Sequence, residues 1–237
     1  MIRWLDTAAG ATAFPPPEAA LANPPGLLAA GGDLAPDRLL AAYRQGIFPW
    51  YEAGQPILWW CPDPRAVILP GELRLSRSLR RTLRRGRFSA SIDQAFPAVI
   101  EACARKDSDA GTWITDEMST AYRQLHALGH AHSIEIWHDG ALAGGLYGIL
   151  IGGVFFGESM FSRVSDASKA ALVHLRDFGV PRGLALLDCQ IPSAHLATLG
   201  SREIPRKAFL ELLARHCADD ALPHGWAHPP GAVTPEP

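Results

Sequence analysis

This chain of 237 residues contains few cysteines and has a formal net charge close to zero. The four cysteines, Cys61, Cys103, Cys189 and Cys217, are scattered and form no CxxC pair. A disulfide framework and a zinc knuckle are therefore both excluded, and we expect reduced thiols in a cytoplasmic protein. The formal net charge is only −2, which argues against a protein that coats nucleic acid over its whole surface. Any contact with nucleic acid must be local.

Long apolar runs are also missing, with one borderline exception. Residues 141–157, ALAGGLYGILIGGVFFG, are uncharged for 17 residues, near the lower limit for a membrane-spanning helix. Six of these residues are glycine, a poor helix former, and the preceding SIEIWH alternates like a strand that ends at the turn signal Asp139-Gly140. We therefore predict a β-hairpin over 133–157 and no membrane contact. The N-terminal MIRWLDTAAG lacks the apolar core of a secretory signal.

Motifs for nucleotides and metals are absent as well. The chain contains neither a Walker loop nor a GxGxxG fingerprint. HALGHAH places His126 and His130 four residues apart, with His132 close by, but Gly129 interrupts the helix. No HExxH motif or nearby carboxylate completes a metal site. We expect no metal and no cofactor.

The turn residues divide the chain in two. The first sixty residues are rich in Pro and Gly and contain one short helix, DRLLAAYRQ, bracketed by Pro36 and Gly46. The strand AVIL, bounded by prolines, follows. We place a domain boundary beside it, which gives a small N-terminal lobe over 1–63 and a larger domain over 64–237.

The larger domain mixes strands with helices. SDASKAALVHLRDFG predicts a helix capped by Ser165 and ended by Gly179, and LALLDCQ predicts a buried strand. SAHLATLG and PRKAFLELLARHC predict two further helices. We expect an α+β fold with a mostly antiparallel sheet packed by helices. The Pro-rich tail over 219–237 has little periodicity and is expected to be loosely held.

The densest charge lies in LRLSRSLRRTLRRGR. Seven of the nineteen arginines fall between Arg74 and Arg87, with no acid among them. On a helix Leu75, Leu79 and Leu83 share one face. The opposite face carries four arginines: Arg77, Arg80, Arg81 and Arg84. A solvated surface helix is the alternative, but such faces usually mix both signs of charge. We expect this helix to bind phosphates of a localised RNA stem, because the guanidinium pairs with phosphate in bidentate fashion.

Polar side chains interrupt two apolar strands. The two-residue period of a strand puts Asp188 and Gln190 of LLDCQ on one face. An acid and an amide there either orient an amine nucleophile and steer its proton, or simply end the strand in water. Glu158 stands within the apolar IGGVFFGESMFS. A buried carboxylate must be paired or used, so this residue is also a candidate.

Several tryptophans lie beside Pro, Gly or Thr instead of within a regular core pattern. FPWY, ILWW and GTWIT contain Trp50, Trp59, Trp60 and Trp113. A Trp in such a position either packs in the core or serves as a stacking platform for a base. The residue pattern alone leaves both readings open.

The bacterial leucyl/phenylalanyl-tRNA-protein transferases resemble this chain in seven blocks, in order: GGDLAPDRLLAAYRQGIFPWY, LWWCPDPRAVI, GTWIT, LGHAHSIE, FFGESMFSR, ASKAAL and LLDCQ. The resemblance runs from about residue 14 to 217. It implies an enzyme that moves leucine or phenylalanine, and methionine less readily, from aminoacyl-tRNA to the α-amine of proteins beginning with Arg or Lys. The new N-terminus would mark those proteins for degradation. The implied fold is a small lobe followed by a domain like that of the GNAT acyltransferases.

The resemblance also assigns roles to single residues. Asp188 and Gln190 match the family's proposed catalytic pair, and Glu158 matches a third functional polar residue. Trp50 and Trp113 match the positions that hold the terminal adenosine of the tRNA. The basic helix matches in charge, so phosphate binding falls to Arg77, Arg80, Arg81, Arg84 and Arg85.

An apolar pocket for the amino-acid side chain is implied in the same way. It would draw on Leu146, Phe155, Met160, Leu172, Leu175 and Leu187. Leu146 and Leu175 stand where other members have Met and Phe, which leaves the preference among Leu, Phe and Met open. In such a pocket a side chain that lacks one methylene loses only about 1 to 3 kcal/mol of binding free energy, so discrimination among apolar amino acids should be graded.

The expected mechanism needs positioning more than activation. Aminoacyl-tRNA is already an activated ester, so transfer requires no ATP. We expect Asp188 and Gln190 to bind the acceptor amine and order proton transfer. We expect Glu158, at the pocket rim, to hold either the ammonium or the side-chain cation of the acceptor.

Two alternatives stay open at this point. One is a GNAT acetyltransferase using acetyl-CoA, although RDFGVP is only a near miss to the pyrophosphate loop of that class because Pro181 replaces its last small residue. The other is a catalytically inactive RNA-binding module. We expect a monomer, since nothing in the chain demands a dimer.

Overall fold

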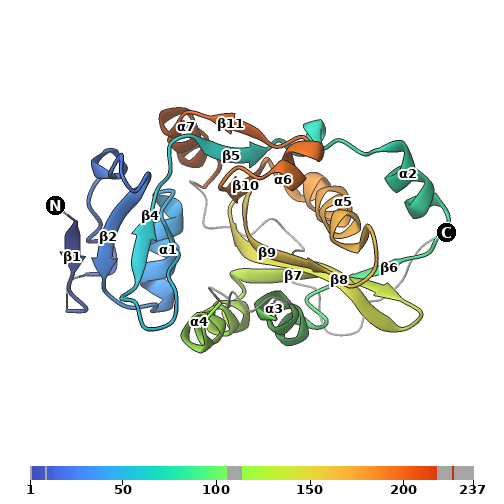
Figure 1. The fold of residues 1–237 in the computed structure, drawn as a ribbon, viewed down its shortest axis with the longest axis horizontal. Helices are drawn as coiled ribbons and strands as arrows, with labels where there is room; N and C mark the ends of the chain where they lie inside the picture. The colour runs from blue at the N-terminus through green and yellow to red at the C-terminus, as the bar shows by residue number, and fades with distance from the viewer. Residues whose placement is uncertain (1, 9, 106–113, 218–225, 227–237) are drawn as a thin grey trace.

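The computed structural model describes residues 2–8, 10–105, 114–217 and 226. The first of its two sheets has the strand order β1-β2-β4-β3 (Figure 1). Its strands are β1 (Arg3–Leu5), β2 (Leu27–Gly31), β3 (Phe48–Pro49) and β4 (Leu58–Trp60). Helix α1 (Pro36–Arg44) begins at its proline and ends just before Gly46, whose φ of 73° lies in the left-handed region. The helix expected between Pro36 and Gly46 is confirmed.

The second sheet has seven strands in the order β11-β5-β10-β9-β8-β7-β6. They are β5 (Arg65–Ile68), β6 (Ser89–Ile92), β7 (Ala131–His138), β8 (Ala141–Ile151), β9 (Val154–Ser162), β10 (Leu186–Gln190) and β11 (Arg202–Ile204). Neighbours are antiparallel except for β9 and β10, which are parallel. A mostly antiparallel α+β fold is therefore confirmed.

The hairpin expected from the turn signal is present. Asp139 and Gly140 join β7 to β8 with φ values of 50° and 74°, the left-handed conformation that a two-residue hairpin turn requires. The uncharged stretch over 141–157 forms β8 and the start of β9. Among the described residues, no helix is both long and apolar enough to cross a bilayer.

Helices cover both faces of the large sheet (Figure 1). One face carries α5 (Ala167–Gly179), and the other carries α3 (Phe96–Ala104) and α4 (Asp116–Ala127). The remaining helices are α2 (Arg77–Arg84), α6 (Ala194–Thr198) and α7 (Arg206–His216). Short 3-10 turns, η1 (Pro17–Ala19), η2 (Pro70–Glu72) and η3 (Val180–Arg182), complete the described elements.

Two apolar cores follow from this layering. The first runs without interruption from the N-terminal sheet to the face of the large sheet beneath α3 and α4, and includes Trp59, Tyr43, Tyr122 and Phe209. The second lies between the opposite face and α5. The link between the two sheets contains the boundary expected between residues 63 and 64. Because the first core crosses that link, the division into two domains stays a prediction.

The start of α5 differs from the expected cap. Asp166, not Ser165, precedes the helix, and its φ of 71° turns the chain so that no side-chain hydrogen bond caps the end at that position. Ser162, at the end of β9, accepts the backbone N–H of Ser168 instead. The prediction that Ser165 caps this helix was wrong, because the hydroxyl of Ser162, and not that of Ser165, accepts a backbone N–H of the first turn.

The C-terminal tail also differs from expectation at one residue. Trp226 is fully buried in the second core, against Phe155 and Phe178. The sequence around Trp226 has no helical or strand periodicity, but burial of its indole alone stabilises this position, because an aromatic side chain buries a large apolar area. At this residue the tail is anchored; the rest of 219–237 lies outside the described residues.

Candidate active site

The parallel pair β9 and β10 separates part of the way along its length. Pairing runs from Leu186 and Val154 to Asp188 and Phe156. Beyond Asp188 the register of β10 against β5 shifts, and Gln190 adopts a φ of 61°. β9 is also irregular here, because its pairing with β8 shifts between Tyr147 and Gly148. These irregularities turn side chains toward the gap between the strands.

A cavity of about 280 Å³ lies at this gap. Its apolar wall contains all six residues that sequence analysis assigns to a side-chain pocket: Leu146, Phe155, Met160, Leu172, Leu175 and Leu187. Its polar end contains Glu158, Asp188 and Gln190. The structure therefore brings together the two sets of residues that β8, β9, α5 and β10 contribute from distant parts of the chain.

Glu158 is held by three donors. The Tyr43 hydroxyl donates to its Oε1 at 2.7 Å, and the Tyr122 hydroxyl donates to its Oε2 at 2.6 Å. The side-chain amide Nε2 of Gln190 also donates to Oε1, at 2.8 Å. Glu158 is only 8% exposed, so it lies deeper than the pocket rim where we expected it.

The surroundings of Glu158 oppose its ionisation. Burial raises the pKa of this carboxyl to about 7, and the Asp188 charge adds to the rise, although hydrogen bonds from Tyr122, Tyr43 and Gln190 lower it. Burial, followed by the Glu158 charge, raises the pKa of both tyrosines well above their ordinary value. The tyrosines thus stay protonated and can donate to an ionised Glu158.

Asp188 is held by an arginine that the motif search did not single out. Arg65 donates from Nε to Oδ1 at 2.8 Å and from Nη2 to Oδ2 at 2.6 Å, and both side chains are fully buried. The guanidinium lies between the rings of Phe48 and Phe209, 4.8 and 4.5 Å from their centroids. Its Nη1 donates to the Gly46 carbonyl at 3.0 Å. This fork satisfies both carboxylate oxygens of Asp188.

Gln190 connects the two carboxylates. Its backbone N–H donates to Asp188 Oδ1 at 2.9 Å, while its side-chain Nε2 reaches Glu158. Asp188 and Gln190 both line the cavity, but so do Leu187 and Cys189, because the shift in register and the left-handed φ of Gln190 break the two-residue alternation. With Nε2 engaged, Gln190 Oε1 is the amide atom left to accept a hydrogen bond from a ligand.

Sequence reasoning missed three residues of this network: Tyr43, Arg65 and Tyr122. Tyr43 carried one available signal, since it lies four residues after Leu39 on the apolar face of α1. Arg65 carried another, because a charge that opens the fully buried strand β5 needs a partner. No local pattern distinguishes Tyr122 from an ordinary buried residue of α4.

The tryptophans divide between surface and core. Trp50 is 41% exposed, and its ring lies 5.5 Å from that of Trp60, whose indole donates to the Trp50 carbonyl. Trp59 is buried and donates to the Gly31 carbonyl. Trp113, the second expected adenosine-binding residue, lies outside the described residues. Trp50 is therefore partly open to solvent, and its role as a stacking platform stays a prediction.

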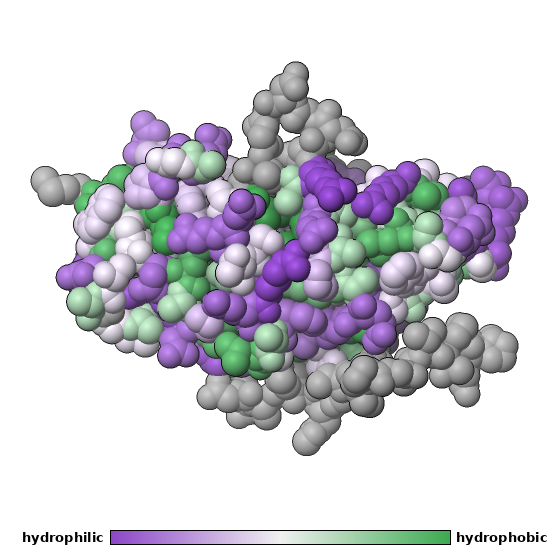
Figure 2. Space-filling model, turned by 90° about the horizontal axis from the view of Figure 1, so that it is seen from below, coloured by the Kyte–Doolittle hydropathy of each residue, from purple (hydrophilic) through white to green (hydrophobic). Residues whose placement is uncertain are grey.

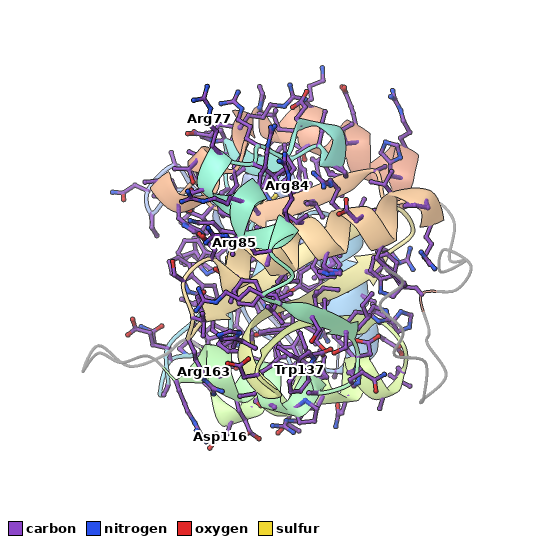
Figure 3. The ribbon with its side chains drawn as sticks, turned by 90° about the vertical axis from the view of Figure 1, so that its right-hand side faces the viewer. Arg77, Arg84, Arg85, Asp116, Trp137 and Arg163 are labelled. Carbon is purple, nitrogen blue, oxygen red and sulfur yellow. The ribbon has the colours of Figure 1, made fainter. Side chains whose placement is uncertain are left out.

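The arginine helix is docked by its leucines. Leu79 is 1% exposed in the second core, and Leu75 and Leu83 pack against the same core. Ser76 caps the helix by accepting the Leu79 backbone N–H. Five exposed arginine side chains line one groove: Arg77, Arg80, Arg81, Arg84 and Arg85. Figure 3 shows three of them on this helix and its C-terminal end, Arg77, Arg84 and Arg85. Hydrophilic side chains gather at this end of the molecule (Figure 2).

The histidines of HALGHAH make local hydrogen bonds. Nδ1 of His132 lies 2.7 Å from Asp93 Oδ2, and Nδ1 of His126 lies 2.8 Å from the Ala131 carbonyl. His126 also stacks on Phe96, with ring centroids 4.1 Å apart. His126 thus links α4 to α3 and β7, and His132 links β7 to Asp93, which lies between β6 and α3.

Together, the helix-covered sheet, the opening between its parallel strands and the acid-amide end of an apolar cavity define an α+β protein with a candidate ligand-binding site at a sheet opening. The family model described as leucyl/phenylalanyl-tRNA protein transferase matches residues 67–214, and that of the N-terminal domain of the same transferase matches residues 32–63. The chain belongs to the leucyl/phenylalanyl-tRNA-protein transferase family.

Relatives with this name are similar over nearly the whole chain. One from Aromatoleum aromaticum is 57% identical over 228 residues, covering 96% of this chain and 95% of its own. One from Methylococcus capsulatus is 53% identical over 232 residues, covering 98% and 99%. Among solved structures, a GCN5-related N-acetyltransferase from Kribbella flavida aligns with a TM-score of 0.34 at 13% identity, covering 70% of this chain and 59% of its own.

Proposed function

We propose that this protein transfers leucine or phenylalanine from aminoacyl-tRNA to the α-amine of proteins whose first residue is Arg or Lys. Family membership supports the reaction class. The observation that carries the proposal is the cavity at the opening between β9 and β10, apolar along one wall and closed by Glu158, Asp188 and Gln190 at the other end. An apolar side chain fits the wall, and the reacting ester then meets the polar end.

The side-chain pocket is assigned to the apolar wall. Leucine and phenylalanine share little except apolar volume, so a pocket lined by aliphatic and aromatic side chains accepts both. Leu172 and Leu175 contribute from α5, and Phe155 and Met160 from β9. Their separation in the chain means that pocket shape depends on how α5 packs on the sheet.

The transfer step forms an amide and breaks an ester. The acceptor nitrogen bonds to the ester carbonyl carbon, the 3′ oxygen of the tRNA leaves, and the proton lost by the amine ends on that oxygen. We assign amine binding to Gln190 Oε1. Asp188 acts through the Gln190 backbone N–H that it accepts, while Arg65 satisfies its charge. Orientation of this kind can contribute several kcal/mol to the rate.

Glu158 is assigned to hold Gln190 in the reactive orientation. An ionised carboxylate accepts Nε2 of Gln190, which turns the amide so that Oε1 is left for the amine. Because both oxygens of Glu158 already accept hydrogen bonds, it attracts the acceptor's positive charge through space instead of pairing with it at the rim.

tRNA binding is assigned to two surfaces. The arginines of α2 meet phosphates of the acceptor stem, and Trp50, with Trp113, stacks on the terminal adenosine. We further propose that the protein acts as a monomer in the cytoplasm and marks its products for N-degron degradation.

The purified protein, mixed with Leu-tRNA and a peptide beginning with Arg, should add one leucine without ATP, CoA or metal, as read by mass spectrometry. A peptide beginning with Glu should stay unmodified. Gln190→Asn, which tolerates the left-handed φ but shortens the amide by one methylene, should lose transfer and keep tRNA binding. Absence of product with wild-type protein that still binds tRNA would favour an RNA-binding module instead.

A further inference from the structure

Trp226 packs one layer behind the side-chain cavity. It is fully buried, and its ring lies 6.5 Å from that of Phe155, a residue of the cavity wall. Phe178 and His132 contact the indole in edge-to-face arrangements at 5.2 and 5.7 Å. Trp226 is thus the described residue of the C-terminal tail that reaches the layer supporting the cavity.

The Phe155 ring has little freedom on its other side. A Cβ added to Gly148 of β8 would lie 2.6 and 2.8 Å from two atoms of this ring, so the ring lies directly against the glycine backbone. Phe155 thus contacts Gly148 and lies within aromatic packing distance of Trp226. Its position sets how far the cavity extends toward Trp226.

Helix α5 depends on the same indole. Leu172 and Leu175 line the cavity, while Phe178 and Gly179, in the next turn, contact Trp226. A Cβ added to Gly179 would lie 3.1 Å from the indole, which shows how closely the helix approaches it. Trp226 therefore supports both the strand side and the helix side of the cavity.

We infer that Trp226 is a specificity-determining positioning residue, which fixes the depth of the amino-acid pocket by holding Phe155 and the last turn of α5. The inference rests on the proposed function, because it requires the cavity to accept the transferred side chain. Removing the indole leaves an apolar hole into which Phe155 can turn. The cavity then deepens, which favours phenylalanine over leucine.

A competition assay tests this inference with the full chain. Equal concentrations of Leu-tRNA and Phe-tRNA are offered with one Arg-peptide, and mass spectrometry gives the ratio of the two products. The ratio does not depend on how much enzyme is folded, so loss of stability alone leaves it unchanged. We expect Trp226→Ala to raise the Phe-to-Leu ratio about tenfold, a typical effect for a change of one or two methylenes in an apolar pocket.

Three controls test whether a change in the product ratio is due to loss of the Trp226 ring. Trp226→Phe keeps an aromatic ring, and the lost indole N–H has no hydrogen-bond partner among the described residues, so its ratio should stay near that of the wild type. Ile100→Ala removes a fully buried side chain from the first core, away from the cavity, and should also leave the ratio unchanged. Added indole should fill the hole in Trp226→Ala and restore the ratio.

An unchanged ratio in a folded Trp226→Ala protein overturns the inference while leaving the transferase activity intact. If Trp226→Ala does not fold, Trp226→Leu carries the same test, with a smaller rise expected and no rise overturning the inference. Failure of the wild-type protein to transfer either amino acid is a different result, since it overturns the proposed function instead.

Discussion

A carboxyl group moved from water into an apolar strand keeps its proton to higher pH, and Glu158 is such a group. Its three donors, Tyr43, Tyr122 and Gln190, reduce this effect but do not cancel it. The ionisation of Glu158 therefore affects both the stability of the fold and the hydrogen bond that orients Gln190.

Glu158→Gln should remove a pH dependence of stability. The unfolded carboxyl releases its proton near pH 4.5 and the folded one near pH 7, so between these values the native state binds more protons. The contribution of Glu158 to the free energy of unfolding is complete below pH 4.5 and falls by about 3 kcal/mol as pH rises through 7. Urea denaturation of both proteins between pH 5.5 and 8 measures the difference, and parallel curves would contradict the assignment.

The ionisation of Glu158 should also appear in the pH dependence of the transfer rate. If ionised Glu158 orients Gln190, kcat/KM for the Arg-peptide rises as pH passes about 7, the pKa of Glu158 in the free enzyme. In Glu158→Gln this step should disappear, leaving only the rise due to the acceptor amine near pH 7.7 to 8.0. A pH–rate profile with an Arg-peptide measures both, and an unaltered profile would remove Glu158 from the mechanism.

Arg65 should matter for stability and transfer in separable ways. Arg65→Met leaves the Asp188 charge buried without its cation, with only the Gln190 backbone N–H as donor, and should destabilise the protein by about 3 to 5 kcal/mol. The double variant Arg65→Met/Asp188→Leu should recover most of that loss, yet remain inactive because the Gln190 backbone has lost its acceptor. Thermal denaturation and single-turnover transfer of the three proteins provide the comparison. Recovery of transfer in the double variant would show that the ion pair is only structural.

At the scale of elements, the exposed arginines of α2 form the proposed phosphate site. Arg80→Gln and Arg84→Gln should each weaken tRNA binding and reduce the slope of log affinity against log salt by about 1, if each side chain neutralises one phosphate. Arg123→Gln is a matched control, since Arg123 lies on α4 in an exposed pair with Glu101. Filter binding at several salt concentrations measures the slopes; equal slopes in all variants would exclude α2 as the phosphate site.

Local patterns predicted most elements correctly, for reasons visible in single residues. The Asp139-Gly140 turn and the Pro36 start of α1 are decided by backbone conformation within two or three residues, and no tertiary contact opposed them. The Ser165 cap failed because Ser162, which belongs to a strand, competed for the same helix end. The burial of Trp226 was missed because its partners on β9 and α5 lie far away in the chain.

In the candidate site, too, local patterns identify single residues but not their partners from distant parts of the chain. Glu158, Asp188 and Gln190 were identified because each is polar within an apolar strand, and family resemblance supplied the pocket residues. Tyr43 comes from the N-terminal side of the link between the sheets, and Arg65 comes from β5, 123 positions before Asp188, so only the folded chain brings them to the site. Sequence patterns indicate which polar residues need partners, but tertiary packing chooses the partners.

At the scale of the whole molecule, the two sheets share one core and one site. We expect them to unfold together, because Tyr43 and Phe48 from the N-terminal lobe complete the surroundings of Glu158 and Arg65. Four of the seven tryptophans, Trp4, Trp50, Trp59 and Trp60, belong to the N-terminal lobe. Fluorescence therefore reports mainly on that lobe, and far-ultraviolet circular dichroism on the larger sheet and its helices. Coincident thermal transitions are expected, and separated ones would show independent domains.

The distance along the chain between Arg65 and Asp188 has a further consequence during protein synthesis. These residues are 123 positions apart, so at about 5 to 20 residues per second the ribosome makes Asp188 roughly 6 to 25 seconds after Arg65. Until then the nascent chain carries a guanidinium without its carboxylate, and until Glu158 is made Tyr43 lacks its acceptor. The polar end of the cavity is therefore complete only when β10 has left the ribosome and can pair with β5 and β9.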